Sequence, residues 1–169
     1  MSLRDVVASQ IRRMLTIAVH RGWEWLCRHG EITPGTPAGL RFRHLGEGAC
    51  IGFPIGTIYG EPWIEVGAHT LIGPHVCLSA GFVPGLDLGP GPIVRIGSGC
   101  SLGRCNQIIG HHSIEIGNDV FTGPNVYITD QNHTYRDPDL PIGRQWPENK
   151  PVVIGDGCWI GRASCRERV

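Results

Sequence analysis

A six-residue spacing of residue–glycine pairs is the feature that most constrains the fold of this chain. In four places a Val, Ile, Leu or Thr followed by Gly returns six residues later: Val66-Gly67 and Ile72-Gly73, Ile96-Gly97 and Leu102-Gly103, Ile116-Gly117 and Thr122-Gly123, Ile154-Gly155 and Ile160-Gly161. Neither an α-helix, with about 3.6 residues per turn, nor a strand, with a period of about 2, produces this spacing. A chain that turns a corner at every repeat does, because each branched residue then points into a shared core. We therefore predict an all-β fold, a parallel β-helix built from hexapeptide repeats.

The composition fits a turn-rich fold and argues against several partners. The 169 residues suffice for one domain, and 25 Gly and 13 Pro without a low-complexity run are expected where short strands alternate with turns. The formal net charge is zero, so neither a nucleic acid nor an anionic membrane is indicated. No apolar run reaches the length of a membrane span.

The cysteines and the N-terminal segment predict a cytoplasmic protein. Seven Cys form no disulfide-framework spacing, and Cys100 and Cys158 fall at a hexad position that favours a small inward side chain. The first apolar stretch carries Arg12, Arg13 and Arg21, which is unlike a signal peptide.

Residues 3–28 predict an amphipathic helix, and Gly30 is a stop signal after its last turn. The helix can be interpreted as a cap over the end of the β-helix or as a basic membrane anchor. We favour the cap, because Asp5 and Glu24 dilute the positive charge. The expected organisation is thus a helix over residues 1–30 and a β-helix over residues 31–161.

The last residues break the repeat. The pattern demands another hexad after Ile160-Gly161, but Arg162–Val169 brings three Arg and one Glu instead. The nucleotides of a common sequencing adapter would also encode Gly161–Val169. We therefore expect residues 162–169 to be a non-native tail on a C-terminally truncated β-helix.

Three interruptions separate the regular hexads, at residues 53–63, 80–92 and 130–151. Extra loops of this kind leave a compact solenoid at its corners, and long ones are usually functional or disordered. The longest contains aromatic residues and charges of both signs, which favours function.

His133 is the candidate catalytic residue of this long loop. It follows a regular strand at once, and an imidazole that is neutral near physiological pH can accept a proton. Asp130 is close enough in sequence to orient the ring. From the residues alone, His133 can equally be an ordinary surface histidine.

Two strings resemble the hexapeptide-repeat O-acetyltransferases of the maltose and galactoside acetyltransferase type. One is Ile116–Ile128 (IGNDVFTGPNVYI), followed by Asn132-His133, and the other is Lys150–Gly161 (KPVVIGDGCWIG). Gly-Pro-Asn-Val, a nearby His, and Lys-Pro-Val ahead of Trp-Ile-Gly rarely occur together elsewhere. The resemblance covers roughly residues 64–161.

This resemblance implies a left-handed parallel β-helix that forms a homotrimer, with acetyl-CoA as co-substrate in the groove between neighbouring copies. It implies that His133 removes the proton of an acceptor hydroxyl, and that no metal is needed because the thioester is already activated. The Trp-Ile-Gly motif, Trp159, Ile160 and Gly161, is assigned to the cofactor site, although Trp159 could instead pack on a neighbouring copy. The expected function is acetyl transfer to a hydroxyl of a sugar or sugar-containing precursor.

Further residues are expected to contact the acceptor: Asp130, Asn132, Tyr135, Trp146 and Asn106. Tyr135 and Trp146 could stack on a sugar ring, or could form a hydrophobic seam that holds the long loop down.

Three alternatives use the same kind of β-helix. A γ-carbonic-anhydrase-like protein would bind zinc through His75, His111 and His112, although adjacent residues of a strand point in opposite directions. A non-catalytic scaffold would show no thioester turnover. A serine acetyltransferase would ordinarily carry a long N-terminal helical domain, which a single short helix does not match.

Overall fold

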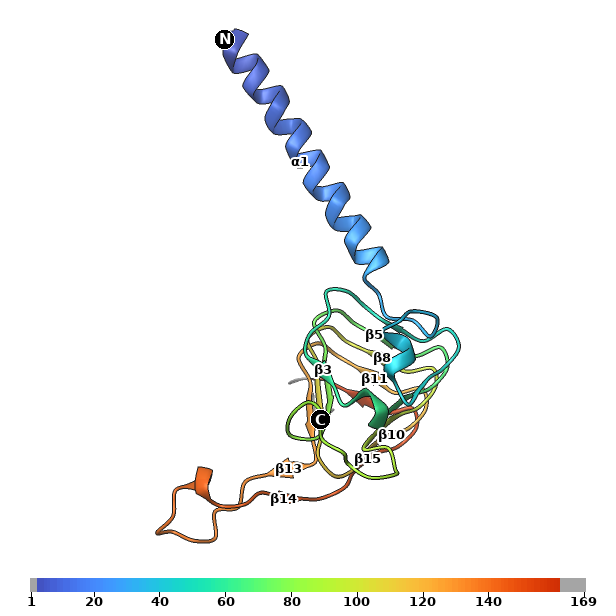
Figure 1. Cartoon of the computed structure of the whole chain (residues 1–169), viewed down its shortest axis with the longest axis vertical. Coiled ribbons are helices and arrows are strands. Elements are labelled where there is room, and N and C mark those ends of the chain that lie inside the picture. The colour runs from blue at the N-terminus through green and yellow to red at the C-terminus, as the bar shows by residue number, and fades with distance from the viewer. Residues whose placement is uncertain (1–2, 162–169) are drawn as a thin grey trace, which may run out of the picture.

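Three parallel sheets, visited by the chain in rotation, form the body of the molecule (Figure 1). The computed structural model describes residues 3–161. β1 (His44–Leu45) belongs to the first sheet, β2 (Cys50–Ile51) to the second and β3 (Ile58–Tyr59) to the third, and the rotation then begins again. Each rotation adds one coil, so the body is parallel-β-helix-like. The expected non-native tail lies outside the described residues.

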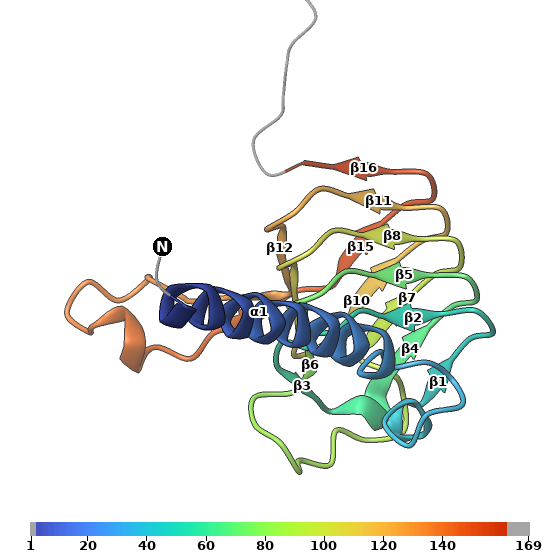
Figure 2. The same cartoon turned by 90° about the horizontal axis from the view of Figure 1, so that it is seen from above.

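Strands of the same sheet come from successive coils and stack in order (Figure 2). The first sheet continues with β4 (Ile64–Val66), β7 (Val94–Ile96), β10 (Ile114–Ile116) and β15 (Val152–Ile154). The second continues with β5 (Leu71–Ile72), β8 (Ser101–Leu102), β11 (Phe121–Thr122) and β16 (Trp159–Ile160). The third continues with β6 (Cys77–Ala80), β9 (Gln107–Gly110) and β12 (Tyr127–Thr129).

Branched aliphatic side chains from all three sheets fill the interior. In the first sheet the register aligns Ile64, Val94 and Ile114, all of which are fully buried. Within β7 the exposed Arg95 stands between buried Val94 and Ile96, as the alternation of a strand requires. The aliphatic repeat residues from Val66 to Ile116 are likewise buried, as the six-residue spacing predicts, and Ile154 and Ile160 of the last pair pack partly buried against this core.

The corners between the sheets repeat a left-handed backbone conformation from coil to coil. At one corner φ is 57° at His69, 69° at Gly99 and 54° at Asp119. Side chains continue this ladder, since Asn118 Oδ1 accepts the Ser98 N–H at 2.9 Å and Asp156 Oδ1 accepts the Asn118 N–H at 2.6 Å. Strictly stacked corners keep successive strands in register.

The interruption at residues 53–63 is not a simple extra loop, contrary to expectation. It contains β3, which pairs with β6, and the short helix η2 (Glu61–Trp63). A strand forms here although the hexad pattern is lost, because β3 pairs with β6 of the next coil. A second short helix, η1 (Gly39–Arg41), precedes β1.

The N-terminal helix α1 (Leu3–His29) forms where the sequence predicts it, but it does not cap the body. It extends away from the coils in Figure 1, and only its last turns approach them. The Trp23 and Phe53 rings lie 6.2 Å apart, and Gly30 donates its N–H to the Leu26 carbonyl at 2.8 Å. The cap prediction is therefore wrong, because the apolar side of α1 remains exposed rather than buried on a coil.

α1 does not meet the requirements for a bilayer span. Among the helices of residues 3–161, none combines the length and the hydropathy that crossing a membrane demands.

Replacing Ile108 of β9 by Ala should lower the free energy of unfolding by about 2–5 kcal/mol, because Ile108 is fully buried and a cavity would remain. Urea denaturation measures this change. Ile142→Ala is the matched control, since Ile142 is 55% exposed and its loss should change stability by less than about 0.5 kcal/mol. Equal effects of the two substitutions would contradict the described core.

Candidate active site

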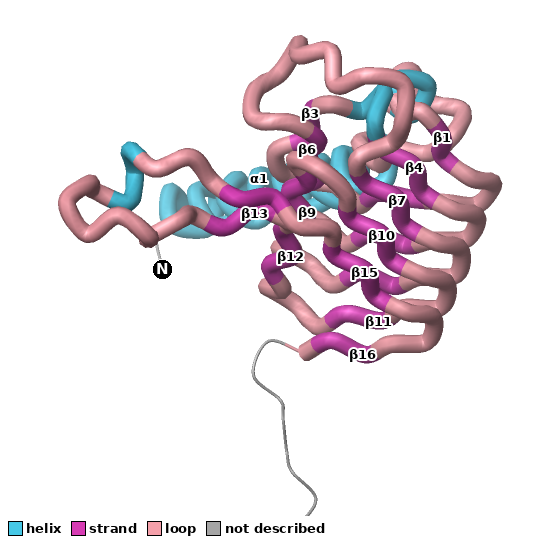
Figure 3. The backbone as a smooth tube through the Cα atoms, turned by 90° about the horizontal axis from the view of Figure 1, so that it is seen from below, coloured by secondary structure: helices cyan, strands magenta, loops and turns pink. Residues whose placement is uncertain are grey.

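A hairpin arm, residues 131–149, projects from the side of the coils (Figure 3). β12 ends at Thr129, and β13 (Gln131–Asn132) then pairs antiparallel with β14 (Glu148–Asn149). The short helix η3 (Ile142–Arg144) lies near its far end. The arm replaces the corner that would otherwise lead from the third sheet back to the first.

A groove of about 820 Å³ lies where the arm leaves the body. Side chains of β12, of both strands of the arm and of the segment entering β15 line it. The lining includes His133, Asn132 and Tyr135, three of the residues that the sequence assigns to the site. Asp130 also lines it from the base of the arm. The predicted base therefore lies in the wall of a cavity and not on a flat surface.

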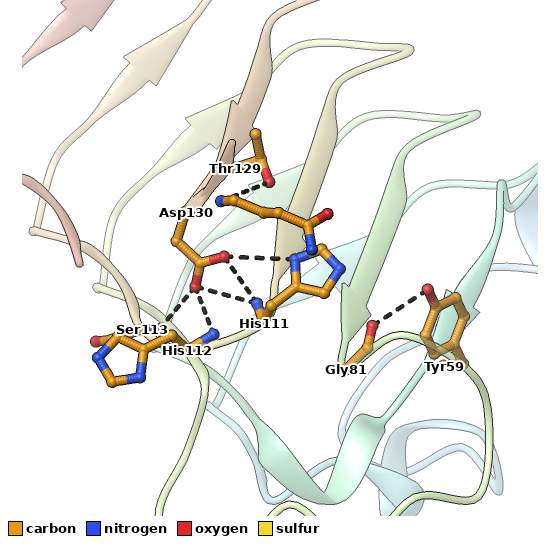
Figure 4. A network of polar contacts seen from close by, with 8 residues as sticks. Tyr59, Gly81, His111, His112, Ser113, Thr129 and Asp130 are labelled. Atoms are coloured by element: carbon orange, nitrogen blue, oxygen red, sulfur yellow. Dashed lines mark hydrogen bonds and ion pairs between the residues drawn. The ribbon is translucent and has the colours of Figure 1, made fainter. Parts of the chain in front are cut away.

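Asp130 fastens the base of the arm to the preceding coil (Figure 4). Its Oδ2 accepts hydrogen bonds from the backbone N–H groups of His112 at 2.6 Å and Ser113 at 2.7 Å, and its Oδ1 accepts one from His111 at 2.9 Å. The carboxylate is fully buried. Hydrogen bonds to an ionised group are stronger than neutral ones, so this contact holds β12 and the turn at residues 111–113 together.

The His111 ring is enclosed beside this carboxylate. Its Nδ1 lies 3.4 Å from Asp130 Oδ1, and its side chain is 7% exposed. The ring centroid is 4.4 Å from that of Phe82, which belongs to the loop after β6. Three segments distant in sequence thus meet around the His111 ring.

The Asp130 and Asn106 side chains make structural contacts within the coils, and the substrate contacts expected for them remain predictions. The Asp130 carboxylate is occupied by the turn at residues 111–113, so it does not orient the His133 ring as expected. Asn106 is 1% exposed, donates to Thr122 Oγ1 and accepts the Val126 N–H at 2.8 Å. Both side chains are buried by the stacking of coils, which the linear sequence does not display.

Tyr135 and Trp146 stand free on the arm. Their side chains are 77% and 87% exposed, so they form no hydrophobic seam against the coils. Thr134 Oγ1 donates to the Trp146 carbonyl at 2.8 Å across the two sides of the arm, and Tyr135 alone of the two aromatic residues lines the groove.

The Trp-Ile-Gly motif lies on a different side of the body from His133. Trp159 is in β16 of the second sheet, opposite Phe121, and is 57% exposed. Ile160 packs against the core, so its side chain is directed inward. Gly161 follows directly after β16. None of the three lines the groove around His133.

Several groove residues were not singled out from the sequence. Arg136 and Glu148 form an ion pair at 2.7 Å across the arm, and Lys150 closes its base by donating its backbone N–H to the Asp130 carbonyl at 2.8 Å. Tyr127 and Val152 add apolar walls. The signal for Lys150 was present in the Lys-Pro-Val string, whereas the Arg136–Glu148 pair depends on the register of the arm.

Within the described residues, a single copy of the chain does not bring together the ligands that a zinc site would need. Across the described residues, no three His, Cys, Asp or Glu side chains form a group that could hold a metal ion. His111 is enclosed beside Asp130, His112 is exposed, and His75 occupies a corner with φ 59°.

Outside the groove, the pKa of one thiol is shifted by its surroundings. Burial raises the pKa of the Cys50 thiol above its ordinary value, and the nearby Glu31 carboxylate raises it further. Cys50 is thus a poor candidate for a thiolate nucleophile.

No family model matches this chain, so the family resemblance drawn from the sequence remains a prediction. Over 68 residues, 40% of its length, the chain is 41% identical to the probable acetyltransferase Rv3034c of Mycobacterium tuberculosis. The matched stretch spans 23% of that relative.

A solved structure has a similar fold. It is that of a mutant of AntD, an N-acyltransferase from Bacillus cereus, in complex with dTDP and coenzyme A. The similarity covers 75% of this chain and 66% of the other, with a TM-score of 0.56 and 15% identity. At this identity the comparison shows the fold alone, which is one that an acyltransferase uses.

Replacing Asp130 by Ala should lower the free energy of unfolding by about 3 kcal/mol, because three backbone N–H groups lose a charged acceptor. Asp139→Ala, at an exposed position on the arm, is the control and should change stability by less than about 0.5 kcal/mol. Chemical denaturation of both variants provides the comparison. If Asp130→Ala is as stable as the control, Asp130 does not fasten the arm.

Proposed function

We propose that this chain is an acyl-CoA-dependent O-acyltransferase that transfers an acetyl group to a hydroxyl of a sugar or sugar-containing precursor. The observation that carries the proposal is the position of His133 in the wall of the groove, directly after β13, the first strand of the arm. The 41% identity to a probable acetyltransferase and the acyltransferase-like fold support this class of reaction.

His133 would act as general base and then as general acid. The imidazole accepts the proton of the acceptor hydroxyl while the hydroxyl oxygen forms a bond to the thioester carbonyl carbon. The tetrahedral oxyanion then collapses, the carbon–sulfur bond breaks, and the thiolate of coenzyme A takes the proton from the imidazolium. The products are the acetyl ester and free coenzyme A, with no metal or covalent enzyme intermediate in the sequence of steps.

The groove has surfaces suited to both reactants. Tyr127, Pro151 and Val152 give an apolar wall that a pantetheine arm could follow. Asn132 provides amide groups that can hydrogen-bond to sugar hydroxyls, and the exposed ring of Tyr135 can stack on a sugar.

The complete site would lie between two copies of a homotrimer of left-handed β-helices. His133 leaves the third sheet and Trp159 lies in the second, so one copy does not bring them together. A neighbouring copy placed against the groove would supply its own Trp159, Ile160 and Gly161 to the acetyl-CoA. This arrangement accounts for the exposure of Trp159 and of the arm in a single chain.

His133→Ala should lower turnover by about a hundredfold or more, because the hydroxyl nucleophile loses its base. Release of the coenzyme A thiol from acetyl-CoA, measured with a panel of sugar acceptors, reports the rate. His112→Ala is the matched control, since His112 is also an exposed histidine but lies outside the groove.

The control should retain turnover within about twofold, and both variants should melt like the parent. A His133→Ala variant that keeps most of its activity would remove His133 from the mechanism. A parent chain without thioester turnover for any acceptor would instead favour the scaffold alternative.

A further inference from the structure

The side chains of α1 present an apolar stripe to solvent. At 100° per residue, Val7, Ile11, Met14, Ala18 and Trp25 fall on one side of the helix, following the spacing of three and four residues. Met14 is 69% exposed and Trp25 is 55% exposed. Large side chains that flank the stripe are also exposed: Leu15 and Leu26. An unburied stripe of this length on a helix that stands away from the body indicates a binding surface.

The positive charge of the chain is concentrated on the same helix. α1 carries five Arg and two acidic residues, whereas the whole chain has a net charge of zero. Arg12 and Arg13 lie on the polar side, whereas Arg4 precedes the stripe and Arg21 interrupts it between Ala18 and Trp25. The helix therefore joins an apolar face to a net positive charge, which is the combination that anionic lipid surfaces bind.

We propose that α1 docks parallel to the surface of an anionic phospholipid bilayer. The apolar stripe would enter the boundary between headgroups and acyl chains, and the long Arg side chains would extend outward to lipid phosphates. Trp25 would lie at headgroup depth, where amphipathic rings are favoured. The helix lies on the surface and does not span, in keeping with its many charges.

A second copy of the chain is a poorer occupant of the stripe. In a bundle of identical helices, Arg4 and Arg21 would lie within the seam, and the net positive charge of each helix would repel the others. A bilayer that contains acidic lipids offers complementary charge and allows the guanidinium groups to remain hydrated.

Vesicle sedimentation of the full chain tests this proposal. Vesicles of equimolar phosphatidylglycerol and phosphatidylcholine should bind the chain at least tenfold more tightly than vesicles of phosphatidylcholine alone. Raising sodium chloride from about 50 to about 500 mM should weaken that binding severalfold, because the electrostatic attraction is screened.

Ile11→Asp should weaken binding to the acidic vesicles at least tenfold, because it places a carboxylate in the stripe. Ile17→Asp is the matched control: it makes the same change on the same helix, and Ile17 is similarly exposed but lies about a third of a turn away from Ile11. The control should change binding by less than about threefold. Both substitutions lie outside the coils, so the melting temperature of each variant should match that of the parent.

The proposal would be overturned if the parent did not bind vesicles, or if the two Asp variants bound them equally well. It would also be overturned if light scattering showed a smaller oligomer for Ile11→Asp than for Ile17→Asp. That result would mean that the stripe binds another copy of the chain. His133→Ala should bind vesicles like the parent, so membrane docking and the proposed catalysis are tested independently.

Discussion

Parallel backbone hydrogen bonds between successive coils position every other part of this molecule. At one corner column the glycine N–H donates to the carbonyl of the next coil at 2.8 Å in three consecutive steps, from Gly67 to Ile96, from Gly97 to Ile116 and from Gly117 to Ile154. The coils approach so closely there that a side chain would not fit, since a Cβ added at Gly97 would lie 2.4 Å from the Gly117 carbonyl oxygen. Close stacking of this kind demands both the glycines and the buried aliphatic residues, which is why the repeat is so strict.

The groove lies where this stacking is interrupted. A regular coil presents only short strands and corners, whereas the hairpin arm opens a groove at its junction with the body. Asp130 compensates for the missing corner by binding the turn at residues 111–113 with its carboxylate. A charged side chain can be buried at this point because three backbone donors surround it. His133, only three residues further on, is thereby mounted on a fixed base although its own segment leaves the coils.

More of the fold than of the candidate site could be predicted from the sequence. The strands after Val66 follow the hexad spacing, and the position of the groove follows from the longest interruption. β3 was missed because its pairing with β6 is visible only when the coils are stacked. The backbone contacts of Asn106 and Asp130 were not predicted for the same reason, since a polar residue that binds the backbone and one that binds a substrate look alike in a linear sequence. The amphipathic pattern of α1 was recognised, but an amphipathic pattern alone does not indicate which surface packs against the apolar side.

The sequence by itself determined the coil, because a period of six is incompatible with any ordinary helix or strand and each repeat carries its own core residue and corner. It also determined that the long interruption holds the histidine. Only the tertiary structure decided that Asp130 serves the backbone, that Trp159 and His133 lie on different sheets, and that α1 extends away from the coils. These are contacts between residues distant in the chain, and their energies depend on the register of stacked coils, which no local pattern encodes.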